Sequence, residues 1–181
     1  MRLSDTLSPF FEALAFAADQ HKFQRRGGYD PLPYINHLIK VTQALLVIGK
    51  EENRDIIVAC ILHDMVEDTD VTIADLTAKF GVHVANIVAE LTDDMAQTYE
   101  HRKQLQVDRA SHLSIPARKI RIADKASNIQ DIFTYPLDWS ADKKKNYVEN
   151  AILVVDQIRG TNQALEDWFD ETVKFAQQRM H

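Results

Sequence analysis

Four ionisable side chains crowd into one short segment, directly after a strongly apolar run. His63 and Asp64 are adjacent, and Glu67 and Asp68 follow one helical turn later. On a helix, adjacent residues point about 100° apart, so His63 and Asp64 can both reach one ion beside the helix. Glu67 and Asp68 share the face of Asp64, because residues three or four apart lie on one face. Ionisable groups at the end of an apolar helix are costly unless a metal ion or a solvent-filled cleft receives them. This segment alone leaves a metal site and a solvated helix end as alternatives.

Two further residues favour the metal site. His37 lies at a predicted helix start, and Asp124 lies on a later predicted helix. With His63 and Asp64, they offer two imidazoles and two carboxylates to one divalent ion. Mixed nitrogen and oxygen ligands with open positions suit Mn²⁺ or Fe²⁺ better than a closed structural Zn²⁺ site. Open positions admit water and substrate oxygens, which is the arrangement used for hydrolysis.

The composition indicates a globular chain with an acidic balance. Of 181 residues, 27 are acidic and 21 are Lys or Arg, so the formal charge is −6. This balance argues against a dedicated nucleic-acid binder, which needs a broad basic footprint. The length suits a single domain, which we expect to span residues 1–181. The one cysteine, Cys60, excludes an internal disulfide, and no segment is typical of a signal peptide or a membrane span. We therefore expect a cytoplasmic protein.

Long amphipathic stretches with only five glycines and five prolines predict an all-α, compact fold. The run before His63 is so continuously apolar that its helix must be buried nearly all round. Asn36, Thr72, Ser140 and Thr161 are predicted to cap helices. The predicted helices cover residues 7–23, 36–48, 53–66, 72–80, 81–91, 99–110, 116–133, 140–158 and 161–175.

These segments, in this order and at these intervals, resemble the HD-domain phosphohydrolases, and among them the stand-alone small alarmone hydrolases of the RelA/SpoT type. The resemblance covers most of the chain. It implies a multi-helix HD-domain fold and a hydrolase-only enzyme that removes the 3′-pyrophosphate of (p)ppGpp. The shared motifs are Tyr34-Ile35-Asn36-His37, His63-Asp64-x-Val66-Glu67-Asp68-Thr69-Asp70, Phe80-Gly81, Leu91-Thr92-Asp93-Asp94, Arg102-Lys103, Ala123-Asp124-Lys125-x-x-Asn128 and Gly160-Thr161-Asn162.

The resemblance also implies roles for single residues. It implies one Mn²⁺ ion held by four ligands: His37, His63, Asp64 and Asp124. Glu67 and Asp68 would be the catalytic pair that orients and deprotonates the attacking water, because a carboxylate in hydrogen-bond reach can take its proton. Asn128 and Tyr147 would contact the nucleotide.

The basic pair Arg25-Arg26 precedes the loop that leads to His37. Guanidinium groups both stack on bases and bind phosphate. The resemblance implies an Arg that stacks on guanine, followed by a cation that meets phosphate. We expect Arg25 and Arg26 to fill these two places; in the alternative alignment Arg26 takes the first and Gly27 the second. A basic helix end exposed to solvent, favoured by the helix dipole, is the alternative explanation of the pair.

The chain departs from the family pattern where basic residues are frequent. Met95 and Gln130 stand at two such positions, and Gly27 at a third in the alternative alignment. Their neutrality puts nucleotide identity and affinity in question. The run 143–145 is all lysine, which is more typical of a solvated helix face than of a binding site. Trp139 is predicted to pack between helices.

Three functions are therefore in competition. The first is Mn²⁺-dependent (p)ppGpp 3′-pyrophosphohydrolase, with a guanosine polyphosphate as partner and neither a nucleic-acid polymer nor a membrane. The second keeps the metal centre but removes phosphate from another nucleotide, such as the 2′-phosphate of NADPH. The third is a module that senses the nucleotide without cleaving it. Retention of both His63-Asp64 and Glu67-Asp68 favours an enzyme over the sensing module.

Overall fold

The computed structural model describes residues 3–28 and 32–180, and this part of the chain is helical. It contains no β-strand over those ranges, only an isolated bridge between Arg25 and Pro33. The prediction of an all-α fold is confirmed. The helices are α1 (Leu3–Gln20), α2 (Ile35–Val47), α3 (Arg54–Ile61), α4 (Met65–Asp68), α5 (Ile73–Phe80), α6 (Val82–Leu91), α7 (Tyr99–Ala110), α8 (Ile115–Thr134), α9 (Ala141–Asp156) and α10 (Gln163–Gln177).

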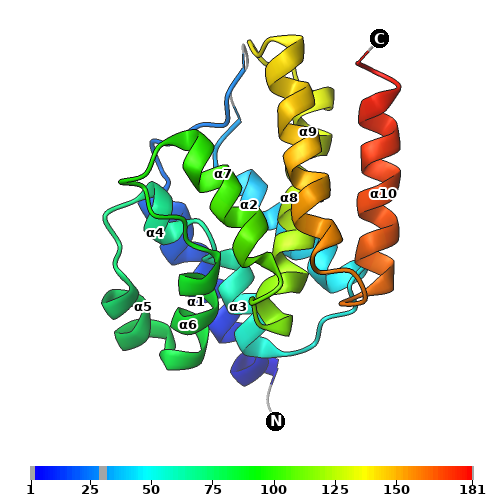
Figure 1. The fold of residues 1–181 in the computed structure, drawn as a ribbon. Helices are drawn as coiled ribbons and strands as arrows, with labels where there is room; N and C mark the ends of the chain where they lie inside the picture. The colour runs from blue at the N-terminus through cyan, green and yellow to red at the C-terminus, as the bar shows by residue number, and fades with distance from the viewer. Residues whose placement is uncertain (1–2, 29–31, 181) are drawn as a thin grey trace.

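Helix α3 lies in the middle of the core. Every residue from Ile56 to Leu62 is buried, as the apolar run predicted. Helices α1, α2 and α6 all pack against α3 (Figure 1). Because α3 has neighbours on several sides, it gains from apolar residues around its whole circumference. The ionisable residues that follow it therefore emerge from the centre of the protein.

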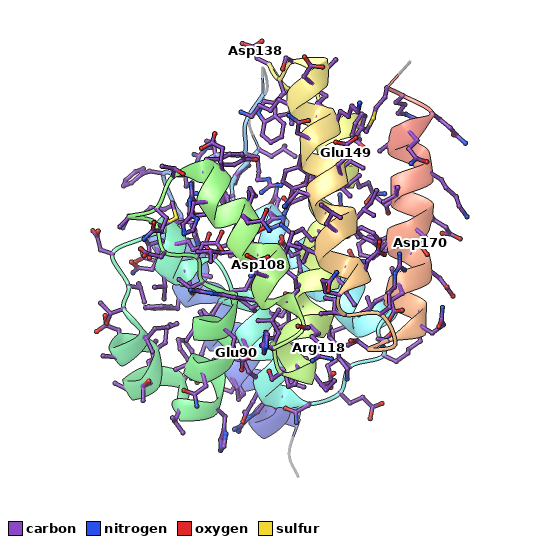
Figure 2. The ribbon with its side chains drawn as sticks, in the orientation of Figure 1. Glu90, Asp108, Arg118, Asp138, Glu149 and Asp170 are labelled. Atoms are coloured by element: carbon purple, nitrogen blue, oxygen red, sulfur yellow. The ribbon has the colours of Figure 1, made fainter. Side chains whose placement is uncertain are left out.

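Helix α8 is the second axis of the fold, and it packs against α2, α6, α9 and α10. Helices α9 and α10 stand side by side along one edge of the molecule (Figure 1). The carboxylates of Asp108, Asp138 and Glu149 are exposed, and Asp138 lies at the tip of the molecule beside the start of α9 (Figure 2). No helix in the described ranges has both the length and the apolar character needed to cross a bilayer.

Two of the predicted caps are confirmed and two are wrong. Thr72 and Ser140 accept hydrogen bonds from backbone N–H groups at the starts of α5 and α9. Asn36 does not cap α2, because the Asn36 N–H already donates to the carbonyl of Pro33 and helical geometry begins one residue earlier. The cap of α10 is Asn162 rather than Thr161, and the Asn162 side chain accepts from the N–H of Leu165.

The predicted continuous helix over 53–66 is wrong. Helix α3 ends at Ile61, and α4 begins at Met65. Between them, Leu62 (φ −103°, ψ 5°) and Asp64 (φ −96°, ψ 1°) adopt turn-like backbone angles. Apolar periodicity runs through this turn because the turn itself is buried, so periodicity alone does not reveal it. His63 and Asp64 consequently leave the chain from a turn rather than from a helix.

The segments 24–28 and 32–34 lie side by side before α2. They are joined by backbone hydrogen bonds from Arg26 to Leu32 (2.9 Å) and from Tyr34 to Gln24 (3.1 Å). The guanidinium of Arg26 also contacts Asn128 and Asp131 on α8. Gly28 has φ +128°, and a Cβ atom there would lie 2.9 Å from the carbonyl oxygen of Pro136. The close approach therefore requires glycine at this position.

Candidate metal centre and adjoining pocket

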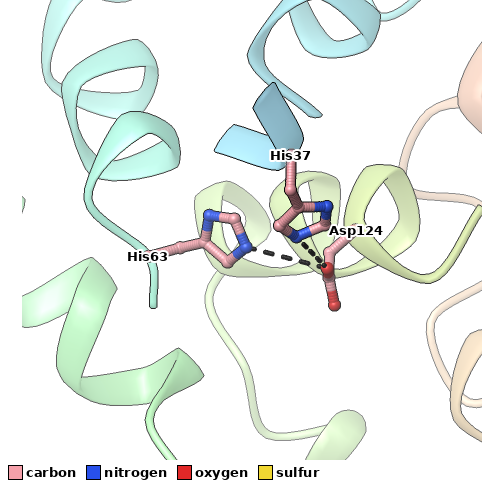
Figure 3. A group of neighbouring side chains, drawn as sticks. All are labelled: His37, His63 and Asp124. Atoms are coloured by element: carbon pink, nitrogen blue, oxygen red, sulfur yellow. Dashed lines mark ion pairs between the residues drawn. The ribbon is translucent and has the colours of Figure 1, made fainter. Parts of the chain in front are cut away.

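Three buried side chains from separate elements meet in the interior. His37 lies in the first turn of α2, His63 in the turn after α3, and Asp124 in the middle of α8. Asp124 Oδ1 lies 3.2 Å from His37 Nε2 and 3.7 Å from His63 Nε2 (Figure 3). Potential ligand atoms of all three lie within 4.8 Å of one another. Two imidazoles and a carboxylate at this spacing can hold a divalent transition-metal ion.

Asp64 adds a second carboxylate to the group. Its Oδ2 atom lies 3.5 Å from His37 Nε2 and 3.3 Å from His63 Nε2. The same oxygen accepts a 2.6 Å hydrogen bond from the hydroxyl of Tyr34. The structure thus brings together all four side chains predicted as ligands. It also reveals a role for Tyr34, which the sequence identified only as part of a motif.

Further hydrogen bonds orient the group. His63 Nδ1 donates to the carbonyl oxygen of Cys60 at 2.7 Å, which leaves Nε2 as the free ring atom. That Nε2 is buried and has no hydrogen-bond partner among the described residues. Asn128 Nδ2 donates to Asp124 Oδ1 at 2.6 Å. An orphaned imidazole nitrogen, backed by a carbonyl on its opposite side, is the usual arrangement of a metal-binding histidine. The residues present therefore fit a divalent metal.

The electrostatics suit a cation as well. Burial opposes the charged forms of Asp64 and Asp124, but the neighbouring imidazoles outweigh it and lower the pKa of both carboxyls. Burial lowers the pKa of His37. Burial also opposes a charge on His63, yet the two carboxylates raise its pKa to about 9. A bound metal cation would compensate the same two negative charges and compete with that proton.

Glu67 and Asp68 have hydrogen-bond partners outside this group. Glu67 is partly buried, and its Oε1 accepts a 2.5 Å hydrogen bond from the N–H of Asp93. Burial and the charge of Asp93 raise the pKa of Glu67 to about 7. Asp68 is exposed and accepts from Gln24 Nε2 at 3.0 Å. Both residues line an open hollow at the molecular surface.

A network behind Glu67 was not predicted from the sequence. Gln106 on α7 donates through Nε2 to Asp93 Oδ2 at 2.6 Å, and its Oε1 accepts from Lys125 Nζ at 2.8 Å. Lys125 is buried, and burial and nearby Lys103 lower its pKa to about 7. Gln106 thereby links the loop that binds Glu67 to the residue next to Asp124. Only tertiary structure brings these partners together, so no sequence spacing signals them.

A pocket of about 230 Å³ adjoins the metal centre. His37 forms part of its wall, and so do all four side chains predicted to bind substrate: Arg25, Arg26, Asn128 and Tyr147. The other walls are largely apolar, and Leu137 and Ile132 contribute to them. Trp139, which the sequence predicts to pack between helices, contacts Tyr147 on α9, with 6.0 Å between ring centroids, and also lines the pocket.

The two arginines behave differently. Arg26 Nη2 donates to Asn128 Oδ1 at 2.5 Å and to Asp131 Oδ2 at 3.2 Å. Arg25 is exposed, and its guanidinium donates to the backbone carbonyls of Lys22 and Gln24. Both arginines border the pocket, but the contacts of Arg26 are with its polar wall and those of Arg25 are with its own loop.

Comparison with known proteins identifies the family to which the chain belongs. A family model described as "HD domain" matches residues 13–135, and the chain belongs to this family. Membership implies a divalent metal cofactor, in agreement with the cluster of His37, His63 and Asp124.

Two curated relatives and one solved structure are similar over nearly the whole chain. Guanosine-3′,5′-bis(diphosphate) 3′-pyrophosphohydrolase MESH1 of Drosophila melanogaster is 39% identical over 90% of this chain and 91% of its own length. The human protein of the same name is 40% identical over 86% and 88%. The solved structure is of a metazoan orthologue of SpoT that hydrolyses ppGpp. It matches 96% of this chain and 97% of its own, with a TM-score of 0.90 and 37% identity. The resemblance predicted from the motifs is confirmed.

Proposed function

We propose that this protein hydrolyses the 3′-pyrophosphate of ppGpp or pppGpp with Mn²⁺ as cofactor, releasing pyrophosphate and GDP or GTP. The observation that carries the proposal is the position of a pocket of about 230 Å³, partly lined by His37, beside the cluster of His37, His63, Asp64 and Asp124. The names of the similar proteins support the choice of substrate.

The proposed ligands of the ion are the same four side chains. When bound, a divalent ion polarises phosphoryl oxygens and lowers the pKa of water. Hydrolysis joins the water oxygen to the phosphorus nearest the ribose and breaks the bond from that phosphorus to O3′, which gains a proton. We assign Glu67 and Asp68 to orient the water and take up its proton, because carboxylates can serve as general bases. Arg26, Asn128 and Tyr147 are assigned to hold the nucleotide in the pocket.

The single cysteine and the overall charge support a cytoplasmic location and a small-molecule substrate. Cys60 is buried, and burial raises the pKa of its thiol to about 12, so it is unreactive and suited to the reducing cytoplasm. The acidic overall charge fits a small anionic substrate bound in a local basic pocket rather than a nucleic-acid polymer.

The test is pyrophosphate release from ppGpp by protein stripped of metal with EDTA and then supplied with Mn²⁺, Mg²⁺ or Zn²⁺. We expect activity only after metal addition, and most with Mn²⁺. Asp68→Asn should reduce kcat by about 100-fold or more while nucleotide binding persists. The matched control, Asp108→Asn on the exposed face of α7, should keep wild-type activity. Faster release of phosphate from NADPH than of pyrophosphate from ppGpp would overturn the substrate assignment.

A further inference from the structure

Lys40 is a pocket residue that the sequence motifs did not indicate. It lies on α2 one turn after His37 and lines the same pocket. Its Nζ atom lies 2.5 Å from Asp131 Oδ1 on α8. The Lys40 side chain is 31% exposed, so it borders the pocket without being sealed in the core.

The charges around Asp131 do not balance. Asp131 receives both Lys40 and Arg26, the latter at 3.2 Å, while its own side chain is only 13% exposed. Two cations therefore share one carboxylate at the pocket wall, and one positive charge is in excess. The surrounding wall is mainly apolar, with Leu32 and Pro136 among its members, so screening by water is reduced there. A local positive excess in a chain of net charge −6 indicates an anion-binding subsite.

Lys40 has N–H donors to spare, as do the two arginines of this wall. An ammonium group has three N–H donors, and among the described residues Asp131 is the partner that Lys40 contacts. The guanidinium of Arg26 is shared between Asn128 and Asp131, and that of Arg25 turns to backbone carbonyls. Gly27 lines the pocket but offers no side chain.

We propose that Lys40 binds the 5′-diphosphate of the nucleotide and thereby makes the pocket select guanosine nucleotides that carry phosphate at the 5′ position. This inference rests on the proposed function, which places the 3′-diphosphate beside His37. The two diphosphates are carried on C3′ and C5′, which are separated by one carbon, so the oxygens that carry them are only a few ångströms apart. His37 and Lys40 share a face of α2 with an axial separation of about 4.5 Å, which matches that requirement.

The test compares Lys40→Gln, Lys40→Arg and the control Lys174→Gln, whose lysine is exposed on α10. Two measurements are made on each. One is the KM and kcat for ppGpp with Mn²⁺, and the other is the calorimetric affinity for GDP and for guanosine, which needs no hydrolysis. Glutamine is similar in length to lysine and neutral, and Asp131 keeps Arg26 as a partner, so we expect the variant to fold; thermal melting checks this.

We expect Lys40→Gln to raise KM about tenfold with little change in kcat, because a charge-assisted hydrogen bond is lost. Its affinity for GDP should fall by a similar factor, while its affinity for guanosine should not change. Lys40→Arg should recover most of the loss, and Lys174→Gln should match the wild type. An unchanged KM, or equal weakening of GDP and guanosine, would overturn the role of Lys40. If the wild type releases no pyrophosphate but binds GDP in a Lys40-dependent way, the proposed reaction fails and the subsite stands.

Discussion

Glu67 offers a test that separates the chemistry of the site from its stability. Its side chain extends from α4, and the carboxyl accepts a hydrogen bond from the N–H of Asp93. Burial, and next the charge of Asp93, raise the pKa of this carboxyl to about 7 from an ordinary value of 4.5. Between these values the folded protein keeps a proton that the unfolded chain has lost. The free energy of unfolding must therefore fall as the pH rises through this window.

The size of the effect follows from the two pKa values. A difference of about 2.5 units corresponds to about 3 kcal/mol once the pH exceeds 7. At about pH 5 only about 1 kcal/mol of this penalty is present, because this pH is only slightly above the pKa of the carboxyl in the unfolded chain. Glu67→Gln removes the titration and keeps an oxygen that can accept from Asp93. We therefore expect the variant to gain about 2.5 kcal/mol relative to wild type between about pH 5 and about pH 8.

The assay is urea unfolding followed by circular dichroism at both pH values, in EDTA so that metal binding does not contribute. Any effect of the substitution that does not depend on pH cancels in the comparison. Glu171→Gln, on the exposed face of α10, is the control and should show no such gain. The same Glu67→Gln protein should lose about 100-fold or more in kcat, because a general base is removed. A stability difference equal at both pH values would refute the reasoning, since the carboxyl would then titrate alike in both states.

Two further predictions concern residues that support the site. Tyr34→Phe removes the hydrogen bond to Asp64 and should weaken metal binding by about 10- to 100-fold in a Mn²⁺ titration; unchanged affinity would show that Asp64 is oriented by other contacts. Gln106→Leu breaks the links to Asp93 and Lys125 and should lower kcat about tenfold with KM nearly constant. A rise in KM without a fall in kcat would instead place Gln106 in substrate binding.

Helix positions were largely predictable because they depend on local sequence. Amphipathic periodicity correctly predicted the bounds of α7, Tyr99–Ala110. The Thr72 and Ser140 caps were also predictable, because each forms a hydrogen bond to a residue only three positions away. Errors arose where a buried turn carries the same apolar pattern as a helix, as at Leu62, or where two adjacent side chains can both cap, as at Thr161 and Asn162.

The site was predictable only in part, for a related reason. Spacing and family resemblance named His37, His63, Asp64 and Asp124, and the structure brings these side chains to one place, although their binding of a metal stays a prediction. Lys40 could not be identified, because its partner Asp131 lies on another helix far along the chain. A single sequence shows which residues share a helix face, but it does not show which faces meet.

The break after α3 sets the geometry of the metal centre. On an unbroken helix His63 and Asp64 would diverge by about 100°. In the turn, His63 Nε2 and Asp64 Oδ2 come within 3.3 Å. Ending a helix in the core leaves its last carbonyls without helical partners, which is costly when they are buried. His63 Nδ1 donates to one of them, that of Cys60. One hydrogen bond thus satisfies the carbonyl of Cys60 and fixes the imidazole with Nε2 facing the carboxylates. The end of the buried helix and the chemistry beside it therefore depend on the same turn.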